Sequence, residues 1–223
     1  MTDRTGRLEG ALRTRRAAGR KLLVPYLTGG LGHDWLQTLE AVAAAGADAV
    51  EVGLPFSDPM IDGPVIQRAS VEALAGGATP EGIVSAIKRA DVGVPIAVMT
   101  YFNLIARAGE HRMASLLASS GVSGAIVPDL PLEEIGPWAD AADAAGVETV
   151  LLAAPTTGTE RLRRICARAR GFLYAVGLMG VTGERSALAA SAAELAARCK
   201  EATDLPVLVG VGISTPAQAR EIC

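Results

Sequence analysis

Short apolar runs alternate with longer amphipathic stretches along most of the chain. Seven of the runs lack polar alternation, which is typical of strands that helices cover on both faces. These predicted strands span Leu22–Thr28, Ala47–Gly53, Val94–Tyr101, Gly124–Pro128, Glu148–Ala153, Phe172–Val176 and Pro206–Val211. The intervening patterns predict helices at Asp34–Ala45, Pro80–Ala90, Glu133–Ala145, Glu160–Ala169 and Ala189–Ala202. The repeat is therefore a βα unit, as in a parallel sheet wrapped by helices.

A doubly wound open sheet and a (β/α)8 barrel can both contain seven such units. The turn after the first strand, LTGGLGHDW, lacks the GxGxxG spacing of a dinucleotide fold, which favours the barrel. The long second connection leaves room for an inserted loop and an extra helix at the end where barrels keep their chemistry. We predict one α/β domain over residues 1–223, a (β/α)8 TIM barrel without its last βα unit. The pattern stops inside the seventh helix, so we expect a longer natural protein.

Composition and charge narrow the function classes. Half of the 223 residues are hydrophobic and 20% are charged, which excludes a disordered chain. The net charge of −3 is spread without long runs, so neither nucleic acid nor an anionic membrane is an expected partner. No signal peptide or membrane span is recognisable, which predicts a cytoplasmic protein. Three cysteines without CxxC spacing and two histidines predict neither a disulfide framework nor a metal site.

Glu51 is the first candidate for chemistry because it lies between Val50 and Val52 in the second predicted strand. Side chains alternate along a strand, so Glu51 is predicted to face the barrel interior. Burial of an unpaired carboxylate raises its pKa, and a carboxyl group that titrates near neutrality can both donate and accept a proton. The alternative is a core glutamate that pairs with a basic residue.

The loop after this strand adds Asp58 and Asp62 among prolines and glycines that stiffen it. A carboxylate on the strand and another on the loop above it can act on opposite sides of one bound substrate. Asp58, in the tripeptide Ser-Asp-Pro, is equally suited to stabilising a turn. These residues predict an acid–base site at the mouth of the barrel.

Glycine-rich turns follow the sixth and seventh predicted strands, at Gly180–Gly183 (GVTG) and Gly210–Ser214 (GVGIS). Glycines allow backbone N–H groups to approach an anion closely, and barrels often bind phosphate in their last βα loops. The alternative is that the glycines only relieve tight turns. We therefore expect a phosphate ester as substrate.

Carbon–carbon cleavage beside a hydroxyl requires a place for the bond electrons, and the sequence offers no evident lysine, metal or cofactor for that purpose. Lys21, Lys88 and Lys200 fall on predicted helices or before a strand, away from the mouth. The substrate would then carry its own electron sink. An enamine-type heterocycle such as indole does so, because protonation at C3 creates an iminium.

The segment VEVGLPFSDPMIDGPVIQ, residues 50–67, resembles the signature of the tryptophan synthase α chain family, whose fold is a (β/α)8 barrel. The resemblance extends over VPYLTGG, MTYFNLI, VPDLP, GVTG and GVGISTPAQ, essentially the whole chain. It implies a lyase that splits indole-3-glycerol phosphate into indole and glyceraldehyde 3-phosphate. It also implies an αββα heterotetramer in which the β chain, using pyridoxal phosphate, joins indole to serine, while the α chain needs no cofactor.

By this resemblance, Glu51 would transfer protons to and from the substrate, and Asp62 would bind the indole N–H. Several further residues match positions around the substrate, although each aromatic among them could be ordinary core, and for Met99 and Ile126 that is the simpler interpretation. The predicted substrate-binding residues are Tyr26, Thr28, Met99, Tyr101, Ile126, Asp129, Tyr174, Thr182, Gly183 and Gly212. Thr182 would belong to a closing lid, and Gly183 and Gly212 would bind phosphate through their N–H groups.

Two other interpretations remain at this point. A related phosphate-binding isomerase or synthase of indole or histidine biosynthesis could also use paired carboxylates, although the isomerases lack the Pro-Phe-Ser-Asp-Pro loop. A non-catalytic activator of the β chain would use only the contact loops, which the resemblance places at residues 57–62 and 129–132. The chain departs from the family where Gly177, Leu178 and Met179 replace a common Ser-Arg before the lid.

Overall fold

The computed structural model describes residues 5–90, 92–177, 185–210, 212 and 215–222. Within these residues, seven parallel strands pair in the order in which they follow one another along the chain. They are Tyr26–Thr28 (β1), Val50–Gly53 (β2), Ile96–Met99 (β3), Gly124–Ile126 (β4), Glu148–Ala153 (β5), Leu173–Val176 (β6) and Val207–Gly210 (β7). All seven predicted strands are confirmed, most of them shorter than predicted. Among the described residues, β1 pairs only with β2 and β7 only with β6.

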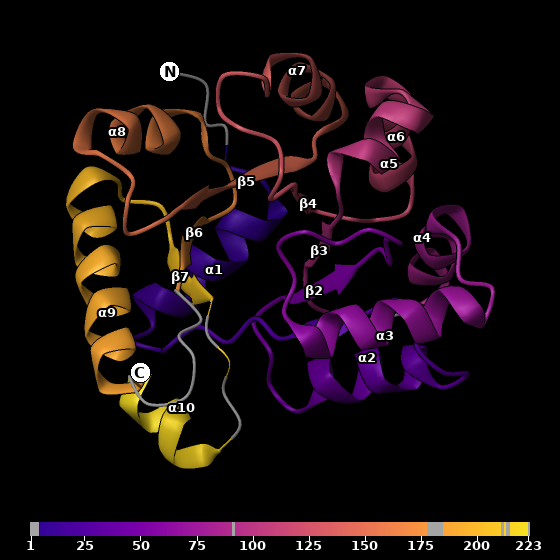
Figure 1. The fold of residues 1–223 in the computed structure, drawn as a ribbon, viewed down its shortest axis with the longest axis horizontal. Coiled ribbons are helices and arrows are strands. Elements are labelled where there is room, and N and C mark those ends of the chain that lie inside the picture. The colour runs from indigo at the N-terminus through magenta and orange to yellow at the C-terminus, as the bar shows by residue number, and fades with distance from the viewer. Residues whose placement is uncertain (1–4, 91, 178–184, 211, 213–214, 223) are drawn as a thin grey trace.

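Helices surround the strands on the outside (Figure 1). The five predicted helices and the expected extra one are present as Trp35–Ala44 (α2), Pro64–Ala75 (α3), Pro80–Arg89 (α4), Gly136–Ala145 (α7), Thr159–Arg168 (α8) and Arg185–Ala202 (α9). Three further helices were not predicted, namely Arg7–Ala17 (α1), Phe102–Ala108 (α5) and Glu110–Ser119 (α6). Pro216–Ile222 (α10) is the expected seventh βα helix. None of the described helices combines the length and hydropathy needed to cross a membrane.

The buried apolar side chains form two separate groups, one on each face of the strands. Val50, Val52 and Val98 belong to the outer group, which fills the space between strands and helices. Ala49 and Ala97 belong to a smaller inner group that also contains Leu8 and other side chains inside the barrel. Because neighbours along β2 alternate between these groups, the face of any β2 side chain follows from its position.

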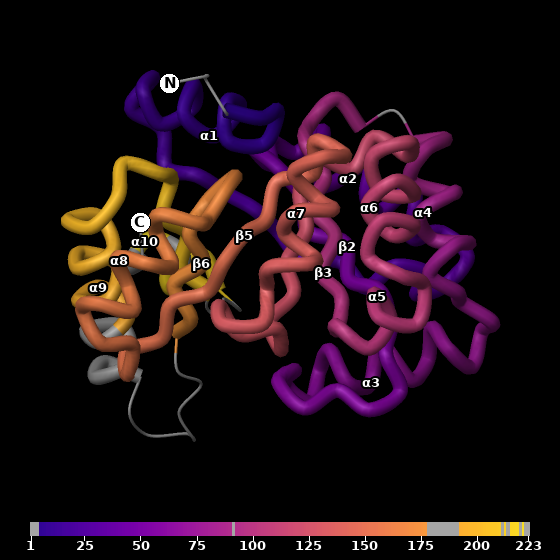
Figure 2. The backbone as a smooth tube through the Cα atoms, turned by 90° about the horizontal axis from the view of Figure 1, so that it is seen from above, coloured from indigo at the N-terminus to yellow at the C-terminus, as the bar shows by residue number. Residues whose placement is uncertain are grey.

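Helix α1 closes the end of the barrel where the strands begin, opposite α3 (Figure 2). Its Leu8 and Leu12 are fully buried in the inner core. The backbone N–H groups of Leu8 and Glu9 donate to the carboxylate of Glu148, the first residue of β5, over 2.7 and 2.9 Å. These bonds satisfy two of the N–H groups that a helix N-terminus leaves without intrahelical partners.

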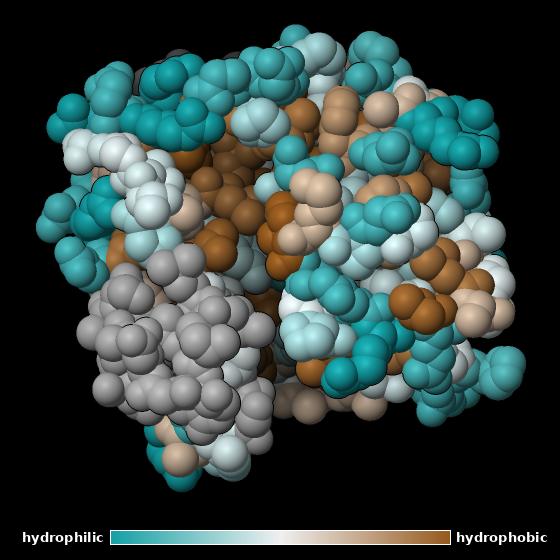
Figure 3. Space-filling view, viewed as in Figure 1, coloured by the Kyte–Doolittle hydropathy of each residue, from teal (hydrophilic) through white to brown (hydrophobic). Residues whose placement is uncertain are grey.

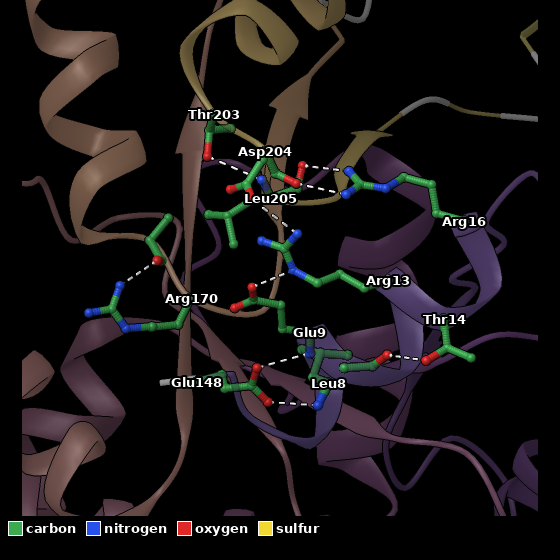
Figure 4. Close-up of polar contacts among 12 residues, drawn as sticks. Leu8, Glu9, Arg13, Thr14, Arg16, Glu148, Arg170, Thr203, Asp204 and Leu205 are labelled. Atoms are coloured by element: carbon green, nitrogen blue, oxygen red, sulfur yellow. Dashed lines mark hydrogen bonds and ion pairs between the residues drawn. The ribbon is translucent and has the colours of Figure 1, made fainter. Parts of the chain in front are cut away.

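The other end of α1 is held beside the start of β7 (Figure 4). Arg13 pairs with Asp204 over 3.2 Å, and Arg16 donates to the backbone carbonyls of Asp204 and Leu205 over 2.8 and 3.2 Å. Helix α1 therefore links the N-terminal ends of β5 and β7. Helix α1 covers the end of the barrel where the strands begin. A binding site is therefore expected at the opposite end, where the strands finish.

Candidate active site

Glu51 projects into the barrel from the middle of β2. Its neighbours Val50 and Val52 pack in the outer core, whereas Ala49 lies in the inner one, so Glu51 shares the inward face. The strand register places it between Tyr26 of β1 and Ala97 of β3. The inward orientation predicted from strand alternation is the one found.

The carboxyl group of Glu51 is buried without a counter-ion. The residue is 5% exposed, and no hydrogen bond or ion pair to its side chain occurs within the described part of the chain. Burial raises the pKa of Glu51 from its ordinary value of 4.5 to about 8. The carboxyl group is therefore mostly protonated at neutral pH and loses its proton just above it. A structural ion pair, the alternative interpretation of Glu51, is absent among these residues.

Asp62 lies on the loop between β2 and α3, at the end of the barrel where the strands finish. Its Oδ2 accepts a hydrogen bond from the Tyr101 hydroxyl over 3.1 Å, and the same hydroxyl accepts one from the Ile61 N–H over 3.1 Å. Partial burial raises the pKa of Asp62, and the Tyr101 hydrogen bond opposes that shift. Phe56, at the start of the loop, stacks on Tyr101 with ring centroids 4.9 Å apart.

Asp58, the other loop carboxylate, is exposed and interacts with the adjacent Ser57 hydroxyl. The turn interpretation of Asp58 fits this local contact. Gln67 of α3 donates from Nε2 to the backbone carbonyl of Asp62 over 2.9 Å. Asp62 is thus held through both its side chain and its backbone, whereas Asp58 projects into solvent.

Two tyrosines lie near both carboxylates. Burial, followed by smaller effects that include the charges of Asp62 and Glu51, raises the pKa of Tyr26 to about 12. The pKa of Tyr174 is also raised, by burial first and then by the charges of Glu51 and Asp62. Because both carboxylates act on both rings, the four side chains share one region inside the mouth. Apolar side chains are visible in a hollow near the centre of the face that carries α3 (Figure 3).

Close approach of these rings explains two glycines. The Tyr26 ring lies against Gly53 of β2, and the Tyr174 ring lies against Gly210 of β7, so neither position has room for a Cβ atom. A larger residue at Gly53 or Gly210 would push a ring from its place. In the sequence, Gly53 ends a predicted strand and Gly210 begins the GVGIS turn, and neither position reveals the ring contact, which depends on the folded structure.

The remaining predicted residues divide into four groups. Met99 and Tyr174 pack against the inner core, and Ile126 is part of it, so these side chains face the barrel interior. Thr28 is buried, and its hydroxyl donates to the Tyr26 oxygen over 3.4 Å. Gly212 is exposed beyond β7. Thr182 and Gly183, the predicted lid and phosphate residues, lie outside the described residues, as do Leu178 and Met179.

Asp129, another predicted substrate-binding residue, contacts the neighbouring loop. Its two carboxylate oxygens accept the backbone N–H of Phe102, over 2.9 and 3.1 Å. Sequence reasoning also missed Phe56 and Gln67, which hold the Asp62 loop. Both lie inside the signature segment, so their position beside Asp62 in the sequence was the available signal.

Comparisons with known proteins agree with this geometry. The family model described as tryptophan synthase alpha chain matches residues 12–223. The chain belongs to the tryptophan synthase alpha chain family. The alpha chain of Thermobifida fusca is 45% identical over 213 residues, which cover 93% of this chain and 79% of that relative. The alpha chain of Streptomyces coelicolor is 42% identical and is matched over 83% of its length by the whole of this chain.

Solved structures of tryptophan synthase share the fold. One from Mycobacterium tuberculosis superposes with a TM-score of 0.89 at 38% identity, covering 98% of this chain and 85% of that chain. The α2β2 complex of Pyrococcus furiosus gives a TM-score of 0.82 at 36% identity, covering 90% and 82% respectively. Membership of the tryptophan synthase alpha chain family confirms the predicted barrel class and removes the isomerase alternative.

Among the described residues, no group of three or more His, Cys, Asp and Glu side chains is arranged to hold a metal ion. The described side chains at the mouth include two carboxyl groups and the tyrosines around them. One carboxyl group is buried, unpaired and titrates near neutrality, and the other is held on a loop by a hydroxyl. Such a pair suits proton transfer combined with stabilisation of a positive charge.

Proposed function

We propose that this chain cleaves indole-3-glycerol phosphate into indole and glyceraldehyde 3-phosphate, the reaction of its family, with Glu51 as the proton-transfer group. The observation that carries the proposal is the environment of Glu51. A buried carboxyl group without a partner among the described residues, with its pKa raised to about 8, is available as an acid and then as a base.

In the first step the protonated Glu51 gives its proton to C3 of the indole ring. The ring double bond supplies the electrons for the new C–H bond, and the ring nitrogen becomes part of an iminium. In the second step the Glu51 carboxylate takes the proton of the side-chain hydroxyl beside C3. The O–H electrons form the aldehyde, the carbon–carbon bond breaks, and its electrons restore the indole ring.

Asp62 would accept the indole N–H and stabilise the positive charge of the iminium. Tyr101 engages Oδ2 of Asp62, whereas Oδ1 has no hydrogen-bond partner in the part of the chain that the structure describes. One oxygen thus fixes the carboxylate and the other is available to the substrate. A carboxylate held in place before the charge develops stabilises that charge without reorganisation.

The predicted substrate-binding residues would serve two parts of the ligand. The ring would lie among apolar and aromatic side chains at the mouth, namely Tyr26, Thr28, Met99, Tyr101, Ile126 and Tyr174. The phosphate would bind the backbone N–H groups of Gly183 and Gly212, with Thr182 closing over the substrate. The inward faces of Met99, Ile126 and Tyr174 support the first of these assignments.

The proposed partner is a tryptophan synthase β chain in an αββα assembly, as in the Pyrococcus furiosus α2β2 complex. The Asp62 loop carries Met60 and Ile61, which are 86% and 53% exposed, and large apolar side chains so exposed are typical of interfaces. Indole would pass to the β chain, where pyridoxal phosphate is expected, and this chain would need no cofactor. We place the enzyme in the cytoplasm.

The test measures indole release from indole-3-glycerol phosphate, with and without β chain. We expect Glu51→Gln to lower kcat by roughly 10³-fold or more and Asp62→Asn by roughly 10²-fold or more, with substrate binding retained. Glu72→Gln and Asp140→Asn, which change exposed carboxylates on α3 and α7, are matched controls that should keep the wild-type rate.

Two results would contradict the proposal. Unchanged turnover in Glu51→Gln would remove Glu51 from the chemistry. No indole release from the wild-type chain, even with β chain, combined with stimulation of the β chain, would instead support a non-catalytic activator. A low basal rate that rises with β chain agrees with the proposal, because the partner would then favour the closed active site.

A further inference from the structure

Asp129 lies in the loop after β4, three residues beyond the end of that strand. Both of its carboxylate oxygens accept the same backbone N–H, that of Phe102, over 2.9 and 3.1 Å. Phe102 lies three residues beyond the end of β3, the strand that pairs with β4. The carboxylate therefore joins two adjacent βα loops at the mouth of the barrel.

The Phe102 N–H has no partner within its own helix. Phe102 is the first residue of α5, and the first four N–H groups of a helix lack intrahelical acceptors. Tyr101 occupies the N-cap position, but its side chain makes no capping hydrogen bond. Asp129 supplies the missing acceptor from the next loop, and its negative charge also suits a helix N-terminus. The peptide group between Tyr101 and Phe102 is fixed by this contact.

The side chain on that fixed backbone is the one that holds Asp62. Tyr101 is 6% exposed, and its hydroxyl donates to Asp62 Oδ2 and accepts the Ile61 N–H, each over 3.1 Å. The ring is restrained on its face by Phe56. Asp129, the Phe102 N–H, Tyr101 and Asp62 thus form a continuous series of contacts across three loops.

We propose that Asp129 is a positioning residue for Asp62, acting through the Phe102 N–H and the Tyr101 hydroxyl. This inference rests on the proposed function, in which Asp62 binds the indole N–H. Both Asp129 oxygens are directed at the Phe102 N–H, so the contact made in this structure is with backbone. A shift of the Tyr101 backbone would move its hydroxyl and therefore the Asp62 carboxylate. Because Asp62 stabilises the transition state in the proposed mechanism, even a small displacement of this group would lower the rate.

The first test needs no substrate and measures amide hydrogen exchange by NMR. In the wild-type chain the Phe102 amide should be protected, although its place in the helix provides no acceptor. We expect Asp129→Ala to accelerate its exchange roughly tenfold to a hundredfold, the range for loss of a hydrogen bond to a charged group. The Ile61 amide, which reports the position of the Tyr101 hydroxyl, should exchange at least about threefold faster.

Two other variants serve as conservative replacement and control. Asp129→Asn keeps one oxygen that can accept the Phe102 N–H, so both amides should stay within about threefold of their wild-type exchange rates. Glu133→Gln changes an exposed carboxylate of the same loop, which pairs with Arg161 instead, and should leave both amides unchanged. If Asp129→Ala does not fold, wild-type protection at Phe102 and the Asp129→Asn variant still decide the question.

The second test measures indole release with β chain present. A positioning role predicts that Asp129→Ala lowers kcat roughly tenfold with less than a threefold change in KM, and that Asp129→Asn restores most of the rate. In the Tyr101→Phe background, where the link to Asp62 is already broken, adding Asp129→Ala should lower kcat by no more than about twofold.

The inference would be overturned by an unprotected Phe102 amide in the wild-type chain, by unchanged exchange at Ile61 in Asp129→Ala, or by additive rate losses in the double variant. A rise in KM alone would assign Asp129 to substrate binding instead and also overturn it. Failure of the proposed function is distinguishable, because a wild-type chain without lyase activity leaves the exchange measurements, and hence the contact series, intact.

Discussion

Two glutamates are buried to the same extent at opposite ends of the barrel. Glu51 and Glu148 are each 5% exposed and each lie on a strand. Glu148 accepts two backbone N–H groups from α1, whereas Glu51 has no hydrogen-bond partner among the described residues. Burial raises the pKa of both, but only at Glu148 do hydrogen bonds to backbone N–H groups offset part of that effect.

The difference separates a carboxyl group that stabilises the fold from one that is available to a substrate. Glu148 satisfies the N-terminus of a helix and so contributes to the closed end of the barrel. Burial of the Glu51 carboxylate carries a desolvation cost, and no hydrogen bond or ion pair among the described residues offsets it. Such an uncompensated group persists where function requires it, and stability is lower as a result.

The largest expected effect follows from removing the charge at Glu51. The pKa of Glu51 is about 8 in the folded chain and near 4.5 unfolded, so its stabilising contribution is complete below about pH 4.5 and is lost as pH rises through 8. Glu51→Gln cannot ionise and escapes this loss. We expect the variant to exceed wild type in free energy of unfolding by roughly 3–5 kcal/mol at pH 9 and by little at pH 4.5.

Urea denaturation of both proteins at several pH values measures this difference. The gain should grow between pH 5 and 8 and then level off. A difference that does not change with pH would show that Glu51 does not titrate as a buried, unpaired acid. The same substitution would then be altering packing only, and the contrast with Glu148 would fail.

Replacement of Glu148, at the closed end of the barrel, should lower the stability of the protein. Glu148→Ala leaves the N–H groups of Leu8 and Glu9 buried without their acceptor, which costs roughly 2–4 kcal/mol. Thermal unfolding should show the loss, while kcat for indole release changes less than about twofold under conditions where the variant is folded. A large fall in kcat of the folded variant would mean that the two ends of the barrel are not independent.

The rate of cleavage should follow the titration of Glu51 and not that of Glu148. Because the protonated form gives the proton to C3, kcat/KM for the chain without β chain should fall about tenfold per pH unit above pH 8 and remain flat just below it. The Asp62→Asn variant should be slower but should show the same decrease of kcat/KM above pH 8. The Glu148→Gln variant should show the wild-type pH profile. A profile that is flat to pH 10 would exclude Glu51 as the acid.

The sequence was sufficient to predict one of these two environments. The inward position of Glu51 follows from the alternation of Val50, Glu51 and Val52, a local property that tertiary contacts did not alter. Its raised pKa follows from that position together with the absence of a partner. The seven strands were also predictable, because each is a short apolar run that ends at a turn.

The role of Glu148 was not predictable in the same way. Its partners Leu8 and Glu9 lie about 140 residues away in the sequence, and α1 itself was missed. The contact between Asp129 and Phe102 was also missed, because both residues lie in loops whose separation depends on the packing of β3 against β4. Local patterns therefore predicted the inward face of Glu51, but not the contacts that Glu148 and Asp129 make with distant residues.

The smallest expected effect concerns the attachment of α1 near β7. Arg13 lies between Glu9, which is buried, and Asp204, whose side chain is 86% exposed. Replacing Asp204 with Asn removes a solvent-screened ion pair and should cost no more than about 0.5 kcal/mol. Replacing Arg13 with Gln also deprives the buried Glu9 of its cation and should cost more, about 1 kcal/mol, measured by urea denaturation at low and high salt. An equal loss in both variants would mean that burial of Glu9 adds nothing to the Arg13 contact, and that α1 is held mainly by Glu148, Arg16 and apolar packing.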